Sequence, residues 1–82
     1  MKSSDILLSL DNESLKVFKN DYDDICVRYV GANVEDNYFI KVVWGAGKDF
    51  ESACDDYLNQ IRGKKLVFDA YNNKRREVLI SW

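Results

Sequence analysis

Histidine and proline are absent from this 82-residue sequence, and each absence narrows what the chain can be. Histidine is the side chain most often used as a general base near neutral pH. It also completes Ser–His–Asp triads, Cys–His pairs and many zinc sites, so these centres are excluded. Proline would stiffen a linker between domains. Its absence, together with the short length, predicts a single domain spanning residues 1–82.

Cysteine is also scarce. The sequence has two, Cys26 and Cys54, fewer than small secreted scaffolds use for a disulfide framework. The apolar run Ile6–Leu8 is shorter than the core of a signal peptide, and no later run approaches the length of a membrane span. We therefore expect a cytoplasmic protein that does not enter a membrane, with both thiols reduced and buried as small hydrophobic side chains.

Charge is distributed unevenly along the chain. Residues 1–60 carry 6 Lys or Arg and 12 Asp or Glu, whereas residues 61–82 carry 6 Lys or Arg and 2 Asp or Glu. The two segments therefore have net charges of −6 and +4, within a total of −2. Two interpretations stay open: one charged segment binds a partner, or the two segments attract each other within one fold.

The clearest element of secondary structure is a helix predicted over residues 49–62. Its apolar residues recur at the spacing of one helical face: Phe50, Ala53, Cys54, Tyr57, Leu58 and Ile61. Asp49 is a favourable N-cap residue, and Gly63 suits the left-handed position that ends a helix. The N-cap, the apolar spacing and the C-terminal glycine all indicate the same helix. We expect it to lie with its apolar stripe against a sheet.

Strands are predicted on both sides of this helix, as two hairpins. Before the helix, Ile25–Gly31 and Tyr38–Trp44 are rich in β-branched and aromatic residues, and the polar segment 32–37 has the composition of a hairpin loop. After the helix, residues 66–71 and 77–82 form the second hairpin, whose terminal tryptophan we expect to dock into the core.

The register of the second hairpin depends on its loop. A three-residue loop would place Phe68 opposite Val78, on one apolar face, and we favour it because the buried face sets the register. A two-residue turn would instead pair Asp69 with Arg76.

The N-terminal segment admits two interpretations. Its apolar residues fit one helix over residues 4–19, but the sequence 10–14 also resembles a break between a short helix and a short strand, which we favour. The predicted fold class is therefore α+β. It consists of an antiparallel sheet of four to five strands, made of two hairpins, with one amphipathic helix at about 49–62 packed on one face and a short N-terminal helix or strand.

Three short motifs have a structural interpretation beside a functional one. The segment Gly45–Asp49 lies where a phosphate loop would lie, but it lacks the glycine spacing and the Ser or Thr of such loops. Its glycines are expected to turn the chain from strand to helix. The acidic segment 20–24 lacks the spacing of a calcium loop and is expected to be a turn. Cys26 and Cys54 lack the spacing of a redox or metal pair, so we expect neither a metal nor a cofactor.

The first candidate surface for a partner is the outer face of the predicted helix, with Glu51, Asp55 and Asp56. Glu51 and Asp55 are like charges one helical turn apart, a pairing that helix stability alone would not select. A solvated face is the ordinary interpretation, and the functional one is an acidic surface for a partner protein with a basic surface.

The second candidate surface is the basic turn of the C-terminal hairpin, with Lys74, Arg75, Arg76 and the neighbouring Tyr71. These residues are suited to phosphate contacts and to stacking on one base. The sequence pI of about 5.0 disagrees with this, because nucleic-acid-binding domains are typically basic overall. The structural interpretation is that cationic turns discourage association between sheet edges.

The predicted function follows mainly from what is missing. We expect a non-catalytic protein–protein interaction module that acts as a regulator or inhibitor, with no cofactor. Compact acidic chains of this size are common among phage, plasmid and toxin–immunity accessory proteins, so this class is an expectation too. The alternative is a weak nucleic-acid-binding protein that uses the basic turn. A homodimer formed through a sheet edge stays open.

Overall fold

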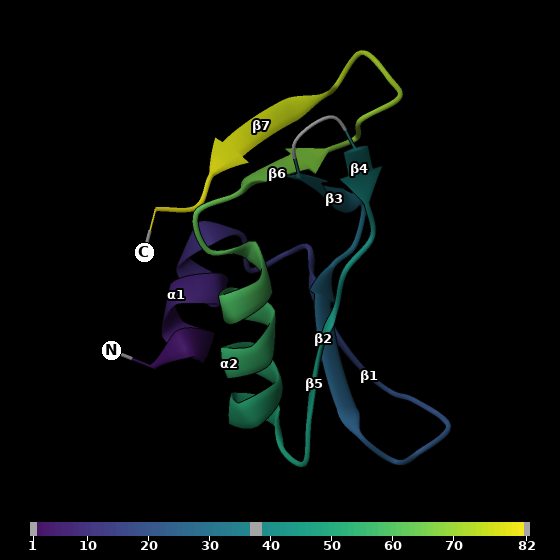
Figure 1. The fold of residues 1–82 in the computed structure, drawn as a ribbon, viewed down its shortest axis with the longest axis vertical. Coiled ribbons are helices and arrows are strands. Elements are labelled where there is room, and N and C mark those ends of the chain that lie inside the picture. Colours follow the sequence, from purple (N-terminus) through teal and green to yellow (C-terminus); the bar gives the residue numbers. More distant parts are fainter. Residues whose placement is uncertain (1, 37–38, 82) are drawn as a thin grey trace.

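Two helices and two antiparallel sheets make up the computed structural model of the chain, which describes residues 2–36 and 39–81 (Figure 1). The elements are α1 (Ser3–Leu10), β1 (Leu15–Lys19), β2 (Ile25–Tyr29), β3 (Ala32–Asp36), β4 (Phe39–Lys41), β5 (Gly45–Gly47), α2 (Phe50–Ile61), β6 (Lys65–Phe68) and β7 (Arg76–Leu79). The α+β class is confirmed, as is the interpretation of the N-terminal segment as a short helix followed by a strand. The predicted Tyr38 and Trp82 positions lie outside the described residues.

The strands divide into a first sheet with the order β1-β2-β5 and a second sheet with the order β4-β3-β6-β7. Helices α1 and α2 lie side by side against one side of the first sheet (Figure 1). Gly31, with a φ of 83°, turns the chain from β2 into β3 and so from one sheet into the other. Because β4 pairs with β3 while β5 pairs with β2, the segment 42–44 carries the chain back to the first sheet.

Two strand predictions need correction. Residues 32–37 were expected to form a hairpin loop, but 32–36 form β3, which pairs with both β4 and β6. The buried Ala32 and Val34 alternate with polar residues, and this period was hidden by the polar composition of the segment. The strand expected over 38–44 is shorter than predicted: β4 covers only Phe39–Lys41, residues 42–44 are in no strand, and pairing resumes at Gly45 in the other sheet.

Helix α2 matches its prediction at both ends. The Asp49 carboxylate accepts a hydrogen bond of 2.8 Å from the Ser52 amide, and Gly63 has a φ of 75° just beyond the last turn. The apolar stripe is buried against the sheet and α1: Ala53, Cys54, Tyr57, Leu58 and Ile61.

The C-terminal hairpin is present, but both predicted registers are wrong. Leu66 lies opposite Val78 and Phe68 lies opposite Arg76, so the loop is longer than either prediction allowed. The Arg76 guanidinium lies 4.0 Å from the centre of the Phe68 ring, and its Nη2 lies 2.6 Å from the Asp11 carboxylate. A cation–π contact and an ion pair thus stabilise a cross-strand pair that hydrophobic pattern alone did not favour.

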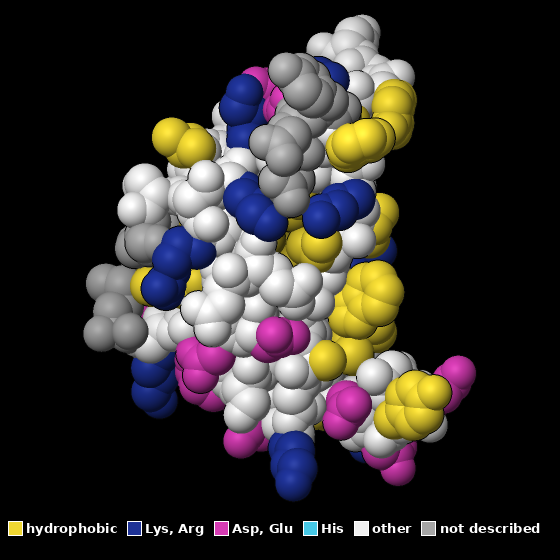
Figure 2. Space-filling model, in the orientation of Figure 1, with side chains coloured by type: hydrophobic (Ala, Val, Ile, Leu, Met, Phe, Trp, Pro, Cys, Tyr) yellow, Lys and Arg dark blue, Asp and Glu magenta, His cyan; other side chains and the backbone are white. Residues whose placement is uncertain are grey.

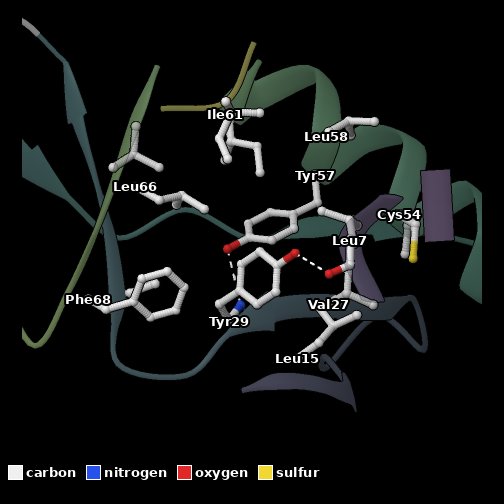
Figure 3. Close-up of a cluster of buried hydrophobic side chains, with 14 residues drawn as sticks. Leu7, Leu15, Val27, Tyr29, Cys54, Tyr57, Leu58, Ile61, Leu66 and Phe68 are labelled. Carbon is white, nitrogen blue, oxygen red and sulfur yellow. Dashed lines mark hydrogen bonds between the residues drawn. The ribbon is translucent and has the colours of Figure 1, made fainter. Parts of the chain in front are cut away.

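Two tyrosines lie at the centre of the core (Figure 3). The Tyr29 and Tyr57 ring centroids are 5.7 Å apart, and Tyr29 lies at the same distance from Phe68 in the second sheet. The Tyr29 hydroxyl donates to the Leu7 carbonyl of α1, and the Tyr57 hydroxyl accepts from the Tyr29 amide at 3.1 Å. These bonds give partners to polar groups that burial would otherwise leave unsatisfied, and they connect β2 to both helices.

Candidate functional site

The part of the chain that the structure describes contains no pocket, and no three Cys, Asp or Glu side chains within it converge as metal ligands. Neither of the two helices is long and apolar enough to cross a membrane. The candidate sites of the described residues therefore lie on the surface. Figure 2 shows Asp and Glu side chains over α1 and the lower half of α2, and apolar side chains along the opposite edge of the molecule.

The acidic surface predicted on α2, defined as Glu51, Asp55 and Asp56, contacts neighbouring elements. The Glu51 carboxylate accepts hydrogen bonds from the Ser4 amide at 3.1 Å and the Ser4 hydroxyl at 2.5 Å. Asp55 accepts a bond of 2.5 Å from the Ser3 hydroxyl. Both carboxylates therefore face the N-terminal turn of α1, where the helix dipole favours negative charge.

The hydrogen bonds at Glu51 have an electrostatic consequence. The Ser4 hydroxyl, and after it the Ser4 amide, hold the pKa of Glu51 below its ordinary value. Glu51 is thus ionised at neutral pH and supplies α1 with an acceptor that its own N-cap, Lys2, does not provide.

Asp56 lies on the other flank of α2, beside β5. Its carboxylate accepts from the Ala46 amide at 2.9 Å and from the Gln60 side chain at 3.2 Å, and the Gln60 amide nitrogen also donates to the Trp44 carbonyl at 2.7 Å. These backbone groups face away from β2, along the outer edge of β5. Asp56 and Gln60 thus cover this edge against further pairing.

The three acidic residues lie on one helix, as predicted, but on two flanks of it rather than on one outer face, and each has a partner within the chain. Asp55 and Asp56 remain exposed, whereas Glu51 is half-buried. A carboxylate has about four acceptor positions, so one or two internal bonds leave capacity for an external donor. Their binding role stays a prediction.

The basic turn is also largely engaged within the chain. Arg75 lies 2.8 Å from Glu77, and Arg76 binds Asp11. Tyr71 and Lys74 are exposed in the loop between β6 and β7. Two of the three predicted phosphate-binding cations thus already face carboxylates, and nucleic-acid binding stays a prediction.

The charge asymmetry of the sequence has a partial structural explanation. Arg76 of the basic segment binds Asp11 of the acidic segment, and Lys65 lies 3.8 Å from Glu35. Both are contacts between the two segments, which supports attraction within the fold as one source of the asymmetry.

Both cysteines are free and fully buried, as predicted. Burial, and after it the charges of Glu51 and Asp55, raise the pKa of the Cys54 thiol to about 11. The thiol is therefore protonated at neutral pH and is a poor nucleophile. The acidic segment 20–24 is a turn, as expected: the Asn20 side chain accepts from the Tyr22 and Asp24 amides.

The glycines of the 45–49 motif have a role that the sequence did not reveal. A Cβ on Gly45 would lie 2.2 Å from the Ala53 carbonyl oxygen, and one on Gly47 would lie 2.7 Å from the Ser52 Cβ. Both glycines lie in β5 and let α2 approach it closely. Their spacing, with one residue between them, was the available signal, because alternate strand residues share a face.

Sequence reasoning also passed over β1 as a candidate site. It is an edge strand of the first sheet, and its last four residues, Lys16, Val17, Phe18 and Lys19, are all exposed. Apolar side chains that are half exposed on a sheet edge are a signal that only the pairing order makes visible.

Comparison of the chain with protein-family models, curated proteins and solved structures gives no match.

Proposed function

We propose that the chain is a non-catalytic protein-binding module that regulates or inhibits a partner with a basic surface, captured by the acidic surface of α2. The observation that carries this proposal is the way in which α2 is fixed on two sides. Ser3 and Ser4 hold Asp55 and Glu51 on one flank, and Ala46 holds Asp56 on the other.

Rigid presentation of charge favours binding for two reasons. Ordered side chains lose less conformational entropy when a partner arrives. Complementary charge also accelerates encounter and rejects partners of the wrong sign. Exposed carboxylates held on a fixed helix have both properties.

The buried titratable groups support a non-catalytic role. Burial raises the pKa values of Tyr29, Tyr57 and Cys54, which keeps all three side chains neutral. All three lie in the core. A cytoplasmic setting is part of the proposal, because free thiols persist in a reducing compartment.

The test is affinity capture from the native host with the full chain, followed by mass spectrometry of the retained proteins. Asp55→Lys is compared with Ser3→Ala, which removes the same internal hydrogen bond but keeps the carboxylate. Asp21→Lys serves as the charge-matched control, because Asp21 lies in the exposed turn between β1 and β2.

We expect Asp55→Lys to lose a basic partner that Ser3→Ala and Asp21→Lys retain. If Ser3→Ala loses the partner as well, the Asp55 carboxylate acts by ordering α1 rather than by contact. Retention of the partner by Asp55→Lys would remove this surface from the proposed function.

A further inference from the structure

We propose that β1 is a second interaction surface, where an extended acidic segment of a partner protein pairs with the first sheet as an added strand. This surface is separate from the acidic surface of α2 and selects the opposite charge.

The backbone of β1 has one side available for pairing. Hydrogen bonds from Val30 to Ser14 and from Asn20 to Asp24 flank its ladder with β2, and both join even-numbered residues of this segment. In an antiparallel ladder, hydrogen-bonded and non-hydrogen-bonded pairs alternate. Val17 and Lys19 therefore direct their N–H and C=O groups away from β2.

Among the described residues, no strand pairs with this side of β1. Within residues 2–36 and 39–81, no side chain binds the outward backbone groups of Val17. At the opposite edge, by contrast, Asp56 binds the Ala46 amide of β5 and Gln60 binds the carbonyl of Trp44, just before β5. The side chain of Val17 is 53% exposed and that of Phe18 is 40% exposed. They lie on opposite faces of the strand, so each face offers an apolar contact to an added strand.

The charges beside this edge favour an acidic occupant. Lys16 lies directly opposite Arg28 on the sheet face that points away from the helices. Two cations in opposite positions destabilise a sheet. The buried Nε of Arg28 also has no hydrogen-bond partner among the residues that the structure describes. A carboxylate placed next to Lys16 by an added strand would relieve this repulsion.

The same charges disfavour two other occupants. A second copy paired through β1 would bring the Lys16 side chains of both copies to diagonal positions on one face. A nucleic-acid strand would extend its phosphates towards the turn that carries Asp21, Asp23 and Asp24. A protein segment can place its carboxylates beside Lys16 and Lys19 and apolar side chains between them.

The test uses a short fluorescein-labelled peptide with Glu-Val-Val-Glu at its centre, followed by fluorescence anisotropy. This order matches Lys16, Val17, Phe18 and Lys19 in either strand direction. One control peptide has Lys-Val-Val-Lys, and a second has N-methylated valines that cannot donate backbone hydrogen bonds.

Two variants of the full chain complete the design. Val17→Pro removes an outward N–H but no hydrogen bond to β2, which a sheet edge tolerates. The double variant Lys16→Glu with Lys19→Glu reverses the charge of the edge and also removes the repulsion from Arg28.

We expect the acidic peptide to bind at least about tenfold more tightly than either control peptide, and Val17→Pro to weaken it about tenfold. The double variant should bind the Lys-Val-Val-Lys peptide more tightly than the Glu-Val-Val-Glu peptide, the reverse of the original preference. If Val17→Pro disturbs the circular dichroism spectrum, this exchange decides the question alone.

Any of these results would overturn the proposal: no binding of the acidic peptide, equal binding of the N-methylated peptide, no exchange of preference, or tighter binding of a single-stranded oligonucleotide. Loss of the basic partner in Asp55→Lys leaves the peptide result unaffected, so the two proposals fail separately. A dimer in sedimentation that Val17→Pro dissociates would identify a second copy as the occupant instead.

Discussion

The two edge strands of the first sheet, β5 and β1, differ in whether their outer backbone groups have hydrogen-bond partners among the described residues. At β5, helix α2 lies so close that Asp56 and Gln60 bind the outer backbone groups of Ala46 and Trp44. At β1, the outer backbone groups of Val17 have no such neighbour among the described residues. Whether a sheet edge is covered or available thus depends on what packs beside it.

The closure of β5 depends on two features acting together. Gly45 and Gly47 allow the approach of α2, because a Cβ on either would clash with the helix. The approach then places the polar side chains of α2 within hydrogen-bond distance of the strand.

Gly45→Ala is expected to have the largest effect. The added Cβ would lie 2.2 Å from the Ala53 carbonyl oxygen and 2.5 Å from the Tyr57 Cβ, so α2 must move away from β5. We expect a loss of about 3 kcal/mol or more in the free energy of unfolding, measured by urea denaturation. At Gly63 an added Cβ meets nothing within 4 Å, so Gly63→Ala should cost only about 1 kcal/mol, through its positive φ. Equal losses in both variants would show that crowding at β5 is unimportant.

Tyr57→Phe should have the next largest effect. The Tyr57 hydroxyl accepts a hydrogen bond from the Tyr29 amide. Pairing of β2 with β5 ends at Val27, so this bond provides the partner that a further residue of β5 would otherwise provide. Its loss leaves a buried amide without a partner, which costs about 1–3 kcal/mol in thermal or urea unfolding. Tyr71→Phe, at an exposed tyrosine, should leave stability unchanged. A Tyr57→Phe protein as stable as Tyr71→Phe would contradict this account.

Asp56→Ala should open the β5 edge without unfolding the protein. The Ala46 amide loses its acceptor but reaches water, so the free energy of unfolding should fall by no more than about 1 kcal/mol. Hydrogen exchange of the Ala46 amide should accelerate towards that of Val17. Asn59→Ala, at an exposed position of the same helix, is the control. An unchanged exchange rate at Ala46 would mean that Asp56 does not cover this edge.

The smallest effect is expected from pH, at the contact between α2 and α1. Because the pKa of Glu51 is lowered, its contribution to stability is present above pH 4.5, its ordinary value, and is lost as the pH falls through the lowered pKa. Ser4→Ala removes the larger cause and should raise the Glu51 pKa in a carboxylate NMR titration, making stability less dependent on pH in this range. Ser9→Ala, whose hydroxyl donates to the Ile6 carbonyl, should leave that pKa unchanged.

Local patterns were sufficient to predict α2 and its ends. The signals for this helix are the caps Asp49 and Gly63 and the apolar stripe. Each depends on residues within one or two helical turns, a range over which helix propensity and capping determine the local structure. The same approach failed for β3, because alternation of Ala32 and Val34 with polar residues acquires meaning only when both neighbouring strands are known. It also failed for the C-terminal register, since Asp11, far away in sequence, helps to hold Arg76 opposite Phe68.

The candidate surfaces show the same division. The acidic surface was visible in the sequence because Glu51, Asp55 and Asp56 lie on one helix. The β1 edge was not, since LKVF reads as a short strand whether it is central or at an edge. The sequence did not reveal that hydrogen bonds from Ser3 and Ala46 to this acidic surface fix the position of α2.

By itself, the sequence determined the α+β class, the capped helix α2 and the burial of two unreactive thiols, because periodicity and residue chemistry act over short distances. Only the tertiary structure decided that the strands form two sheets, and which edge α2 covers. Strand pairing and helix approach depend on contacts between distant residues, such as Gly45 with Ala53 and Arg76 with Asp11, whose free energies no local pattern encodes.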